Sequence, residues 1–274
     1  MARPREALSL DRPLELRRVV RELGSTAVAY SGGVDSALLL KVAVEELGRE
    51  ALAITAVSPS YPRRDLERAQ DLARSLGARH VLLETHEMDQ PGYRANGLDR
   101  CYFCKKELFG VLGAEARRRG LAWVAYGANQ DDLGDFRPGM KAAREAGARA
   151  PLLEAGMGKD EIRELSRELG LPVWNQPAKA CLSSRFPFGS PITEDGLRRV
   201  ERAEEVLEDL GFGQLRVRCH EDLARIELDA AGMARLAAEP TLGGHITTAL
   251  KKVGFRFVTL DLEGYRSGVF NPES

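Results

Sequence analysis

Residues 29–40, "AYSGGVDSALLL", join an apolar run to an apolar helix pattern through two adjacent glycines. This layout predicts a buried strand over 26–30 and a helix over 35–47, with a tight turn at the glycines between them. The first turn of a helix has backbone N–H groups without intrahelical partners, so it attracts anions. We therefore expect this turn to bind phosphate.

Apolar and amphipathic segments alternate along the first two thirds of the chain. Strands are expected over 51–57, 79–84 and 121–127, and helices over 64–76, 104–120 and 158–170. Strands that alternate with helices predict a parallel sheet covered on both faces. The glycine turn then lies at the carboxyl ends of the strands, where open parallel sheets bind ligands.

The pattern changes near residue 190. A helix is expected over 193–210, an antiparallel strand pair over 215–219 and 223–228, helical structure over 230–253 and a last strand over 255–262. We therefore predict an α/β chain of two domains. The first, 1–188, holds the parallel sheet, and the second, 189–274, is a smaller α+β domain for substrate binding or oligomerisation.

The composition is that of a soluble globular protein, with 43% hydrophobic and 30% charged residues among 274. The formal net charge of -1 gives no basic field for nucleic acid, and no apolar run is long enough to span a membrane. The N-terminus lacks the apolar core of a secretory signal, so a cytoplasmic location is expected. Four cysteines in that compartment favour metal ligands, nucleophiles or core residues over disulfides.

Two familiar phosphate motifs do not fit the glycine turn. A Walker A loop needs a lysine after its last glycine, but Val34 and Asp35 follow Gly33, and the glycine spacing of a dinucleotide fingerprint is absent. "SGGVDS" instead resembles the loop of the PP-loop ATP pyrophosphatase superfamily. The resemblance implies that the ATP pyrophosphate is held by Ser31, Gly32, Gly33 and Ser36. A strand–turn–helix with a plain side-chain cap is the alternative.

Asp35 has a role of its own in this resemblance, which implies that it helps to hold Mg²⁺ and contributes to catalysis. A carboxylate beside phosphates is repelled unless a divalent cation lies between them. The superfamily cleaves ATP to AMP and pyrophosphate, usually to adenylate an oxygen that a nucleophile then displaces. The nucleophile therefore distinguishes one member from another.

The cysteines supply candidate nucleophiles and metal ligands. Cys101 and Cys104 form a C-x-x-C motif, which fits a zinc knuckle, a redox pair, cluster ligands or chance. If the loop of Cys181 rises above the same sheet edge, three thiolates can hold a [4Fe-4S] cluster and leave one iron open. The alternative is unligated thiols of which only Cys181 is reactive. Cys219 lies in a strand pattern and is expected in the core.

Cationic residues flank Cys181. Lys179 precedes it by two residues and Arg185 follows it by four, and nearby cations lower the pKa of a thiol. Prolines flank the segment, which lacks helical or strand periodicity. We therefore expect a shaped loop with a reactive thiolate and with Arg185 as a catalytic partner, although solvated charges are the alternative.

Five segments in order are similar to the LarE family of ATP-dependent sulfur transferases. They are "SGGVDS", "CYFCKKELF", "GANQDDLGDFRPG", "PAKACLSSRFPFG" and "GFRFVTLDLEGYRSG". The resemblance covers about residues 15–268. It implies that the carboxylates of a pyridinium-3,5-dicarboxylate mononucleotide are adenylated and converted to thiocarboxylates, for the nickel-pincer nucleotide cofactor of lactate racemase.

The family has two branches with different sulfur sources. In one, a single cysteine at the position of Cys181 attacks the acyl-adenylate and gives up its sulfur, which leaves dehydroalanine. In the other, three cysteines hold a [4Fe-4S] cluster whose open iron binds sulfide from a sulfide donor. The presence of Cys101 and Cys104 beside Cys181 resembles the cluster branch and predicts these three residues as metal ligands.

Other positions match by role. Gly127, Asn129, Asp131 and Asp132 follow a strand end and are expected to orient ATP or Mg²⁺, with Asp135 and Arg137 in the same loop. Arg216 and Arg218 alternate on one strand face, where two guanidiniums suit the phosphate of the mononucleotide, although a solvated face is the alternative. The family resemblance also implies a homo-oligomer.

Three other functions compete with this interpretation. A tRNA thiolase of the same superfamily would need a basic surface for RNA, against which the near-zero net charge argues. An amide-forming ligase of the GMP- or NAD-synthase type would use ammonia and would need no cysteine triad. A non-catalytic nucleotide-binding or metal-sensing protein would release no pyrophosphate.

Overall fold

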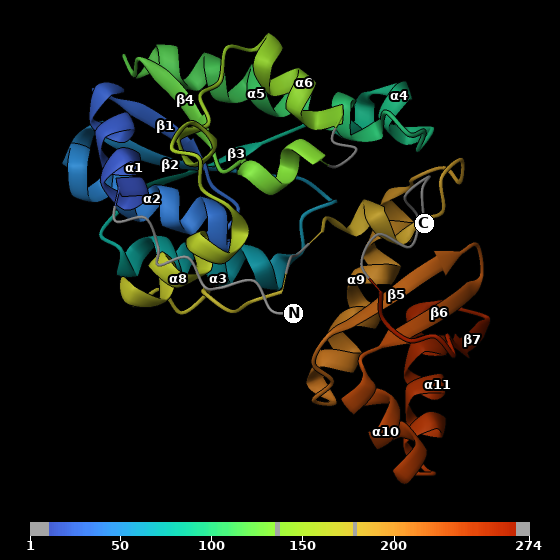
Figure 1. Ribbon diagram of the computed structural model, residues 1–274. Coiled ribbons are helices and arrows are strands. Elements are labelled where there is room, and N and C mark those ends of the chain that lie inside the picture. Colours follow the sequence, from blue (N-terminus) through green and yellow to red (C-terminus); the bar gives the residue numbers. More distant parts are fainter. Residues whose placement is uncertain (1–10, 135–137, 178–179, 267–274) are drawn as a thin grey trace. The chain divides into compact units, whose positions relative to one another are not determined.

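The computed structural model describes residues 11–134, 138–177 and 180–266 (Figure 1). Lys179, Asp135 and Arg137 lie outside these ranges. The chain divides into two compact units. Unit 1 comprises Met1–Ser58, Arg63–Glu87 and Cys101–Lys179, and unit 2 comprises Pro59–Pro62, Met88–Arg100 and Ala180–Ser274.

Unit 1 contains a four-stranded parallel sheet with the strand order β3-β2-β1-β4. The strands are β1 (Thr26–Ala29), β2 (Ala51–Val57), β3 (Arg79–Glu84) and β4 (Trp123–Tyr126). β1 lies between β2 and β4, with Ala29 level with Ile54 on one side and Tyr126 on the other. Since the three strands are parallel, the loop after β1 leaves the sheet at its carboxyl edge.

Helices cover both faces of this sheet (Figure 1). They are α1 (Asp11–Glu22), α2 (Val34–Leu47), α3 (Arg63–Ser75), α5 (Arg100–Arg118), α6 (Pro138–Glu145), α7 (Pro151–Glu154) and α8 (Lys159–Glu168). The short helix α4 (Pro91–Arg94) belongs to unit 2. Short 3-10 helices occur at Gly48–Glu50, Glu87–Asp89, Gln130–Gly134 and Leu182–Arg185. None of the helices described is long and apolar enough to cross a membrane.

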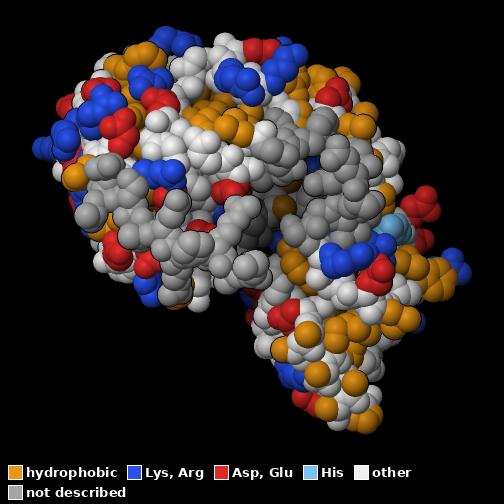
Figure 2. All heavy atoms as spheres, in the orientation of Figure 1, with side chains coloured by type: hydrophobic (Ala, Val, Ile, Leu, Met, Phe, Trp, Pro, Cys, Tyr) orange, Lys and Arg blue, Asp and Glu red, His pale blue; other side chains and the backbone are white. Residues whose placement is uncertain are grey.

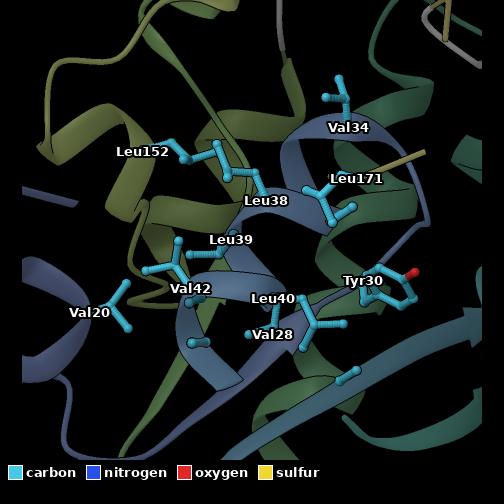
Figure 3. Packing of buried hydrophobic residues seen from close by; sticks show 14 of the residues in the cluster. Val20, Val28, Tyr30, Val34, Leu38, Leu39, Leu40, Val42, Leu152 and Leu171 are labelled. Carbon is cyan, nitrogen blue, oxygen red and sulfur yellow. The ribbon is translucent and has the colours of Figure 1, made fainter. Parts of the chain in front are cut away.

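Alternate residues of each buried strand contact opposite layers. Val28 of β1 packs with α1, α2 and α8, whereas Ala27 packs with Leu112 and Ala116 of α5. α2 lies at the centre of the first cluster, and Leu38, Leu39 and Leu40 are fully buried (Figure 3). The buried helix therefore fixes the direction in which its first turn points.

Unit 2 contains a three-stranded sheet with the order β5-β6-β7. β5 (Leu215–His220) and β6 (Leu223–Leu228) are antiparallel, and β7 (Phe257–Leu260) joins β6 in parallel. The helices are α9 (Glu194–Asp209), α10 (Ala230–Ala238) and α11 (Leu242–Val253). Leu197, Val200 and Leu207 of α9 are fully buried, as are Val217 and Ala224 of the sheet.

The α/β class is confirmed, with a parallel sheet followed by a smaller sheet in the C-terminal part. Unit 2 also takes in two segments from before residue 101, because Ser60 O accepts a hydrogen bond from Leu182 N and Asn96 O accepts one from Gly189 N. The sequence interpretation contains no helix over Asp11–Glu22. Leu16, Val19, Val20 and Leu23 follow its helical period, and all four are buried.

Candidate functional site

The loop between β1 and α2 is shaped by Gly32. Its φ of 70° lies in the left-handed region, and a Cβ there would lie 2.8 Å from the Cβ of Ala69. A side chain at position 32 is therefore disfavoured both by the backbone conformation and by the available space. This explains on physical grounds why the loop begins with this glycine.

Serine hydroxyls converge inside the loop. Oγ of Ser36 donates to Gly33 O at 3.1 Å and accepts from the backbone N–H of Ser31 at 3.2 Å. The hydroxyls of Ser31 and Ser36 lie 3.2 Å apart. Hydroxyl and amide groups thus gather at the first turn of α2, where the helix dipole favours an anion.

Asp35 forms an ion pair with a lysine of another helix. Nζ of Lys159, the first residue of α8, lies 2.5 Å from Oδ2 of Asp35, and Nδ2 of Asn129 donates to Oδ1 at 3.3 Å. Both charged side chains are partly exposed, at 24% for Asp35 and 31% for Lys159. The carboxylate is an oxygen ligand of the kind that Mg²⁺ takes, and it already faces a positive charge. The residues present therefore fit the expected cation.

The loop after β4 supports this arrangement. A Cβ on Gly127 would lie 3.0 Å from Ser36 N and 3.1 Å from the Cβ of Asp35, so this loop approaches the first turn of α2 closely. Asp132 accepts from Asn129 N at 3.0 Å, and Asp131 accepts from the backbone N–H of Lys159 at 2.5 Å. The structure thus brings together Gly127, Asn129 and Asp132 with the phosphate loop.

A partly buried histidine, His80, contacts the residues beside the loop. Thr55 donates to the carbonyl of Tyr30 at 2.7 Å, and its hydroxyl lies 2.8 Å from Nε2 of His80. With the Thr55 proton directed to Tyr30, Nε2 of His80 acts as the donor. Burial lowers the pKa of His80, so the neutral ring is favoured.

In unit 2, Arg185 shapes the backbone at Cys181. Its guanidinium donates to Ala180 O at 2.6 Å and to Cys181 O at 2.9 Å, and it pairs with Glu204 at 2.7 Å. The side chain is 4% exposed, and Glu204 also accepts from Val217 N at 2.9 Å. Arg185 contacts the carbonyl of Cys181, and Glu204 compensates its charge. These bonds hold the backbone at Cys181, and the catalytic role expected for Arg185 stays a prediction.

Arg216 and Arg218 have different environments. Arg218 is buried, forms a two-pronged pair with Glu227 at 2.7 and 2.8 Å, and donates to Ser184 O at 2.9 Å. Arg216 lies over the ring of Tyr265 at 5.2 Å. Burial, reinforced by the nearby charge of Arg185, lowers the pKa of Arg216.

The cysteines fall in both units. Cys101 is exposed and Cys104 is partly exposed; they are three residues apart near the start of α5, so their thiols share one side of the helix. Cys181 is partly exposed in unit 2, and Cys219 is buried, as expected for a core residue. Within the described ranges, no group of three or more His, Cys, Asp or Glu side chains is arranged to hold a metal ion.

The sequence interpretation did not single out two residues, one in each unit, that form ion pairs with predicted site residues. Lys159 lies in the predicted helix "GKDEIRELSRELG", and a lysine in the first turn of that helix was the available signal. Glu204 lies in α9, and its side chain is directed to Arg185 by tertiary packing. No local pattern distinguishes it from the other glutamates of that helix.

Known proteins resemble the chain over most of its length. An uncharacterised protein from Synechocystis sp. is 50% identical, with 93% of this chain and 95% of that protein aligned. A pyridinium-3,5-bisthiocarboxylic acid mononucleotide synthase from Lactiplantibacillus plantarum is 40% identical, with 92% and 91% aligned. A GMP synthase [glutamine-hydrolyzing] from Aeropyrum pernix is 27% identical, with 70% of this chain and 41% of that protein aligned. No protein-family model matches the chain.

Proposed function

Because the chain belongs to the family of pyridinium-3,5-bisthiocarboxylic acid mononucleotide synthases, we propose that it converts carboxylates of a pyridinium-3,5-dicarboxylate mononucleotide into thiocarboxylates with ATP. The family resemblance of the motifs is thereby confirmed. The observation that carries the proposal is the juxtaposition of the serine hydroxyls, Asp35 and Lys159 at the first turn of α2. It brings hydroxyl groups that can donate hydrogen bonds to phosphate together with a carboxylate and a lysine ammonium group.

The first half of the reaction is assigned to unit 1. The hydroxyls of Ser31 and Ser36 and the N–H groups of the glycine turn would bind the ATP phosphates. Asp35, with Asn129 and Asp132 nearby, would hold Mg²⁺, which neutralises phosphate charge when it is bound. Lys159 then exchanges its carboxylate partner for a phosphate oxygen. Attack of a substrate carboxylate on the α-phosphorus releases pyrophosphate and leaves an acyl-adenylate.

The second half is assigned to the cysteines. Sulfide that attacks the acyl carbon forms the C–S bond, and the C–O bond to AMP breaks, so the products are a thiocarboxylate and AMP. Cys101, Cys104 and Cys181 have the soft thiolate donors that an iron–sulfur cluster requires. Such a cluster, when bound by three of them, supplies an iron with an open position for sulfide. The alternative source of sulfur is Cys181 itself.

The substrate phosphate is assigned to Arg216, with Arg218 as its support. Arg216 is partly buried and lies over the ring of Tyr265 at 5.2 Å, with the charge of Arg185 nearby. A phosphate monoester could accept charge-assisted hydrogen bonds from this guanidinium. Arg218 is engaged with Glu227 and the carbonyl of Ser184, so it holds the loop of Cys181 against β5.

The strongest alternative is a tRNA thiolase of the PP-loop superfamily. Figure 2 shows basic and acidic side chains interspersed on the face in view, rather than a surface of one sign. The GMP synthase resemblance would favour an amide-forming ligase, but it covers only 41% of that enzyme. The similarity over nine tenths of the mononucleotide synthase favours sulfur transfer.

A reaction assay tests the proposal. Purified protein with ATP, Mg²⁺, a sulfide source and the dicarboxylate mononucleotide should release pyrophosphate and yield a product heavier by the exchange of oxygen for sulfur. Asp35→Ala should abolish both while the circular dichroism spectrum stays unchanged, because Asp35 is a partly exposed ligand rather than a core residue. Pyrophosphate release only with ammonia or with tRNA as co-substrate would contradict the proposal.

A further inference from the structure

A separate segment of the chain holds the loop of Cys181 in unit 2. Asn96 is fully buried and has a φ of 54°, in the left-handed region that residues other than glycine seldom adopt. Its Nδ2 donates to Pro187 O at 2.8 Å and to Ser190 O at 3.0 Å. Its backbone carbonyl accepts from Gly189 N at 3.0 Å. One side chain thus binds carbonyls on both sides of a turn that is also closed by the backbone bond from Ser190 N to Pro187 O at 3.0 Å.

Arg100 extends this contact toward Cys181. Its Nη1 donates to Oδ1 of Asn96 at 2.6 Å and to the carbonyl of Ser183 at 2.9 Å. The guanidinium is buried at 6% exposure and lies 5.8 Å from the centre of the Phe188 ring. Ser183 is two residues after Cys181, so the bond fixes the backbone next to the thiol.

Tyr93 makes a third bond to the same point. Its hydroxyl lies 2.5 Å from Oγ of Ser183, and both residues are buried, at 1% and 0% exposure. The carbonyl of Cys181 in turn accepts from Ser184 N at 3.0 Å and from its hydroxyl at 2.8 Å. Hydrogen bonds therefore hold the backbone from 181 to 190 at several of its carbonyls. Because the polar groups named here are paired, their burial carries a small desolvation penalty.

We propose that Asn96 and Arg100, assisted by Tyr93, are positioning residues for the Cys181 thiol. The hydrogen bonds given above join them to the loop of Cys181 and to one another. Their loss should therefore leave pyrophosphate release intact and uncouple it from sulfur transfer, since a displacement of about 1 Å at a reacting group can lower its rate by about 100-fold. This consequence for transfer rests on the function proposed above.

Asn96→Gly is the most selective variant. Glycine adopts a φ of 54° without strain, so the substitution removes the side-chain bonds and keeps the backbone conformation. Tyr93→Phe is a milder second variant that removes only the hydroxyl. Arg94→Ala is the matched control, because Arg94 is exposed on the same segment and contributes only its carbonyl, which accepts from Ile192 N.

Two measurements decide the matter. The first is the ratio of thiocarboxylate formed to pyrophosphate released, which should fall by about 100-fold in Asn96→Gly, less in Tyr93→Phe and not in Arg94→Ala. The second is alkylation by iodoacetamide in reduced, metal-free protein, mapped by peptide mass spectrometry. Cys181 should react faster in Asn96→Gly relative to Cys104 of the same chain, because the loop around the thiol is released.

Each outcome has a defined meaning. An unchanged ratio together with unchanged alkylation of Cys181 would overturn the proposal, and so would a parallel loss of pyrophosphate and thiocarboxylate, which indicates general destabilisation. If the unsubstituted protein transfers no sulfur at all, the proposed function fails, and the alkylation of Cys181 still tests the positioning role by itself.

Discussion

Nζ of Lys159 lies 2.5 Å from Oδ2 of Asp35, although 124 residues separate them in the chain. The first turns of α8 and α2 therefore meet at the carboxyl edge of the parallel sheet, with a positive charge where a metal–phosphate complex is expected. Without a ligand, this pair stabilises the carboxylate beside the glycine loop. With ATP and Mg²⁺, both partners are available for the ligand because neither is deeply buried.

Lys159→Met should lower the rate of pyrophosphate release by about 100-fold, the loss typical of one preorganised charge at a reacting centre. The methionine keeps most of the side-chain volume and removes the charge. Initial rates over a range of ATP concentrations would separate a weaker affinity from slower chemistry.

Lys41→Met is the matched control for that change. Lys41 lies on α2 itself and pairs with Glu45 at 2.9 Å on the surface, away from the loop. Its loss should leave the rate unchanged. A rate in Lys159→Met equal to that of the control would remove Lys159 from the site.

Arg216→Ala should weaken binding of the mononucleotide more than binding of ATP, because ATP has its own loop in unit 1. One charge-assisted pair with a phosphate corresponds to roughly 1.5–3 kcal/mol, or about 10- to 150-fold in affinity. Isothermal titration with each ligand separately measures the difference. Equal weakening of both ligands, or of neither, would show that Arg216 does not bind the substrate phosphate.

Arg218→Ala should act differently from Arg216→Ala. It leaves the fully buried Glu227 paired with the partly exposed Arg225 but without the buried guanidinium, so the free energy of unfolding should fall by about 3–5 kcal/mol. Urea unfolding measures this loss. Arg256→Ala, which removes an exposed arginine of the same unit, should change stability by less than about 0.5 kcal/mol. Equal stability of the two variants would contradict the structural role of Arg218.

The strand, the glycine turn and the helix at 26–47 were predicted correctly because their evidence is local. Gly32 and the apolar residues on both sides of it specify a strand, a turn and a helix within twelve letters. The same holds for the burial of Cys219, which follows from strand alternation. The helix at Asp11–Glu22 was not predicted from the sequence. Its apolar residues are helically spaced, but the many charged residues among them make this spacing hard to recognise.

Charge partners could not be predicted in the same way. Arg185 was interpreted from its distance in sequence to Cys181, but its guanidinium is directed at carbonyl groups and at Glu204, a residue of another helix. Likewise Arg218 points to Glu227, which is opposite Arg216 in the strand register. Tertiary packing decides such pairs, and neither composition nor periodicity contains that information.

The stability of the protein should depend on pH through His80. Burial lowers the pKa of His80 below its ordinary value of 6.5, so the folded state keeps the ring neutral while the unfolded chain takes up a proton. The free energy of unfolding is therefore undiminished above 6.5 and decreases as the pH falls below it. His80→Gln should reduce this part of the pH dependence, as measured by urea unfolding at several pH values. An unchanged slope below 6.5 would show that His80 does not titrate differently on folding.

The two possible sources of sulfur predict different effects when each cysteine is replaced by alanine. If Cys101, Cys104 and Cys181 together bind a [4Fe-4S] cluster, replacing any one by Ala should abolish the cluster and sulfur transfer together, because a cluster with two protein ligands is labile. Iron and acid-labile sulfide in anaerobically purified protein, with the product yield, measure both. Cys219→Ala is the matched control, since Cys219 is buried in the sheet of unit 2.

If Cys181 is instead the sulfur donor, its thiolate forms a thioester and releases AMP. β-Elimination then transfers the Cα proton to a base and breaks the Cβ–S bond, which leaves dehydroalanine. Cys101→Ala and Cys104→Ala would then keep a single turnover, and the protein would become lighter by one H₂S at Cys181. We expect the cluster outcome because the C-x-x-C motif accompanies the third cysteine. Dehydroalanine at Cys181 after reaction of the cluster-reconstituted protein would overturn that expectation.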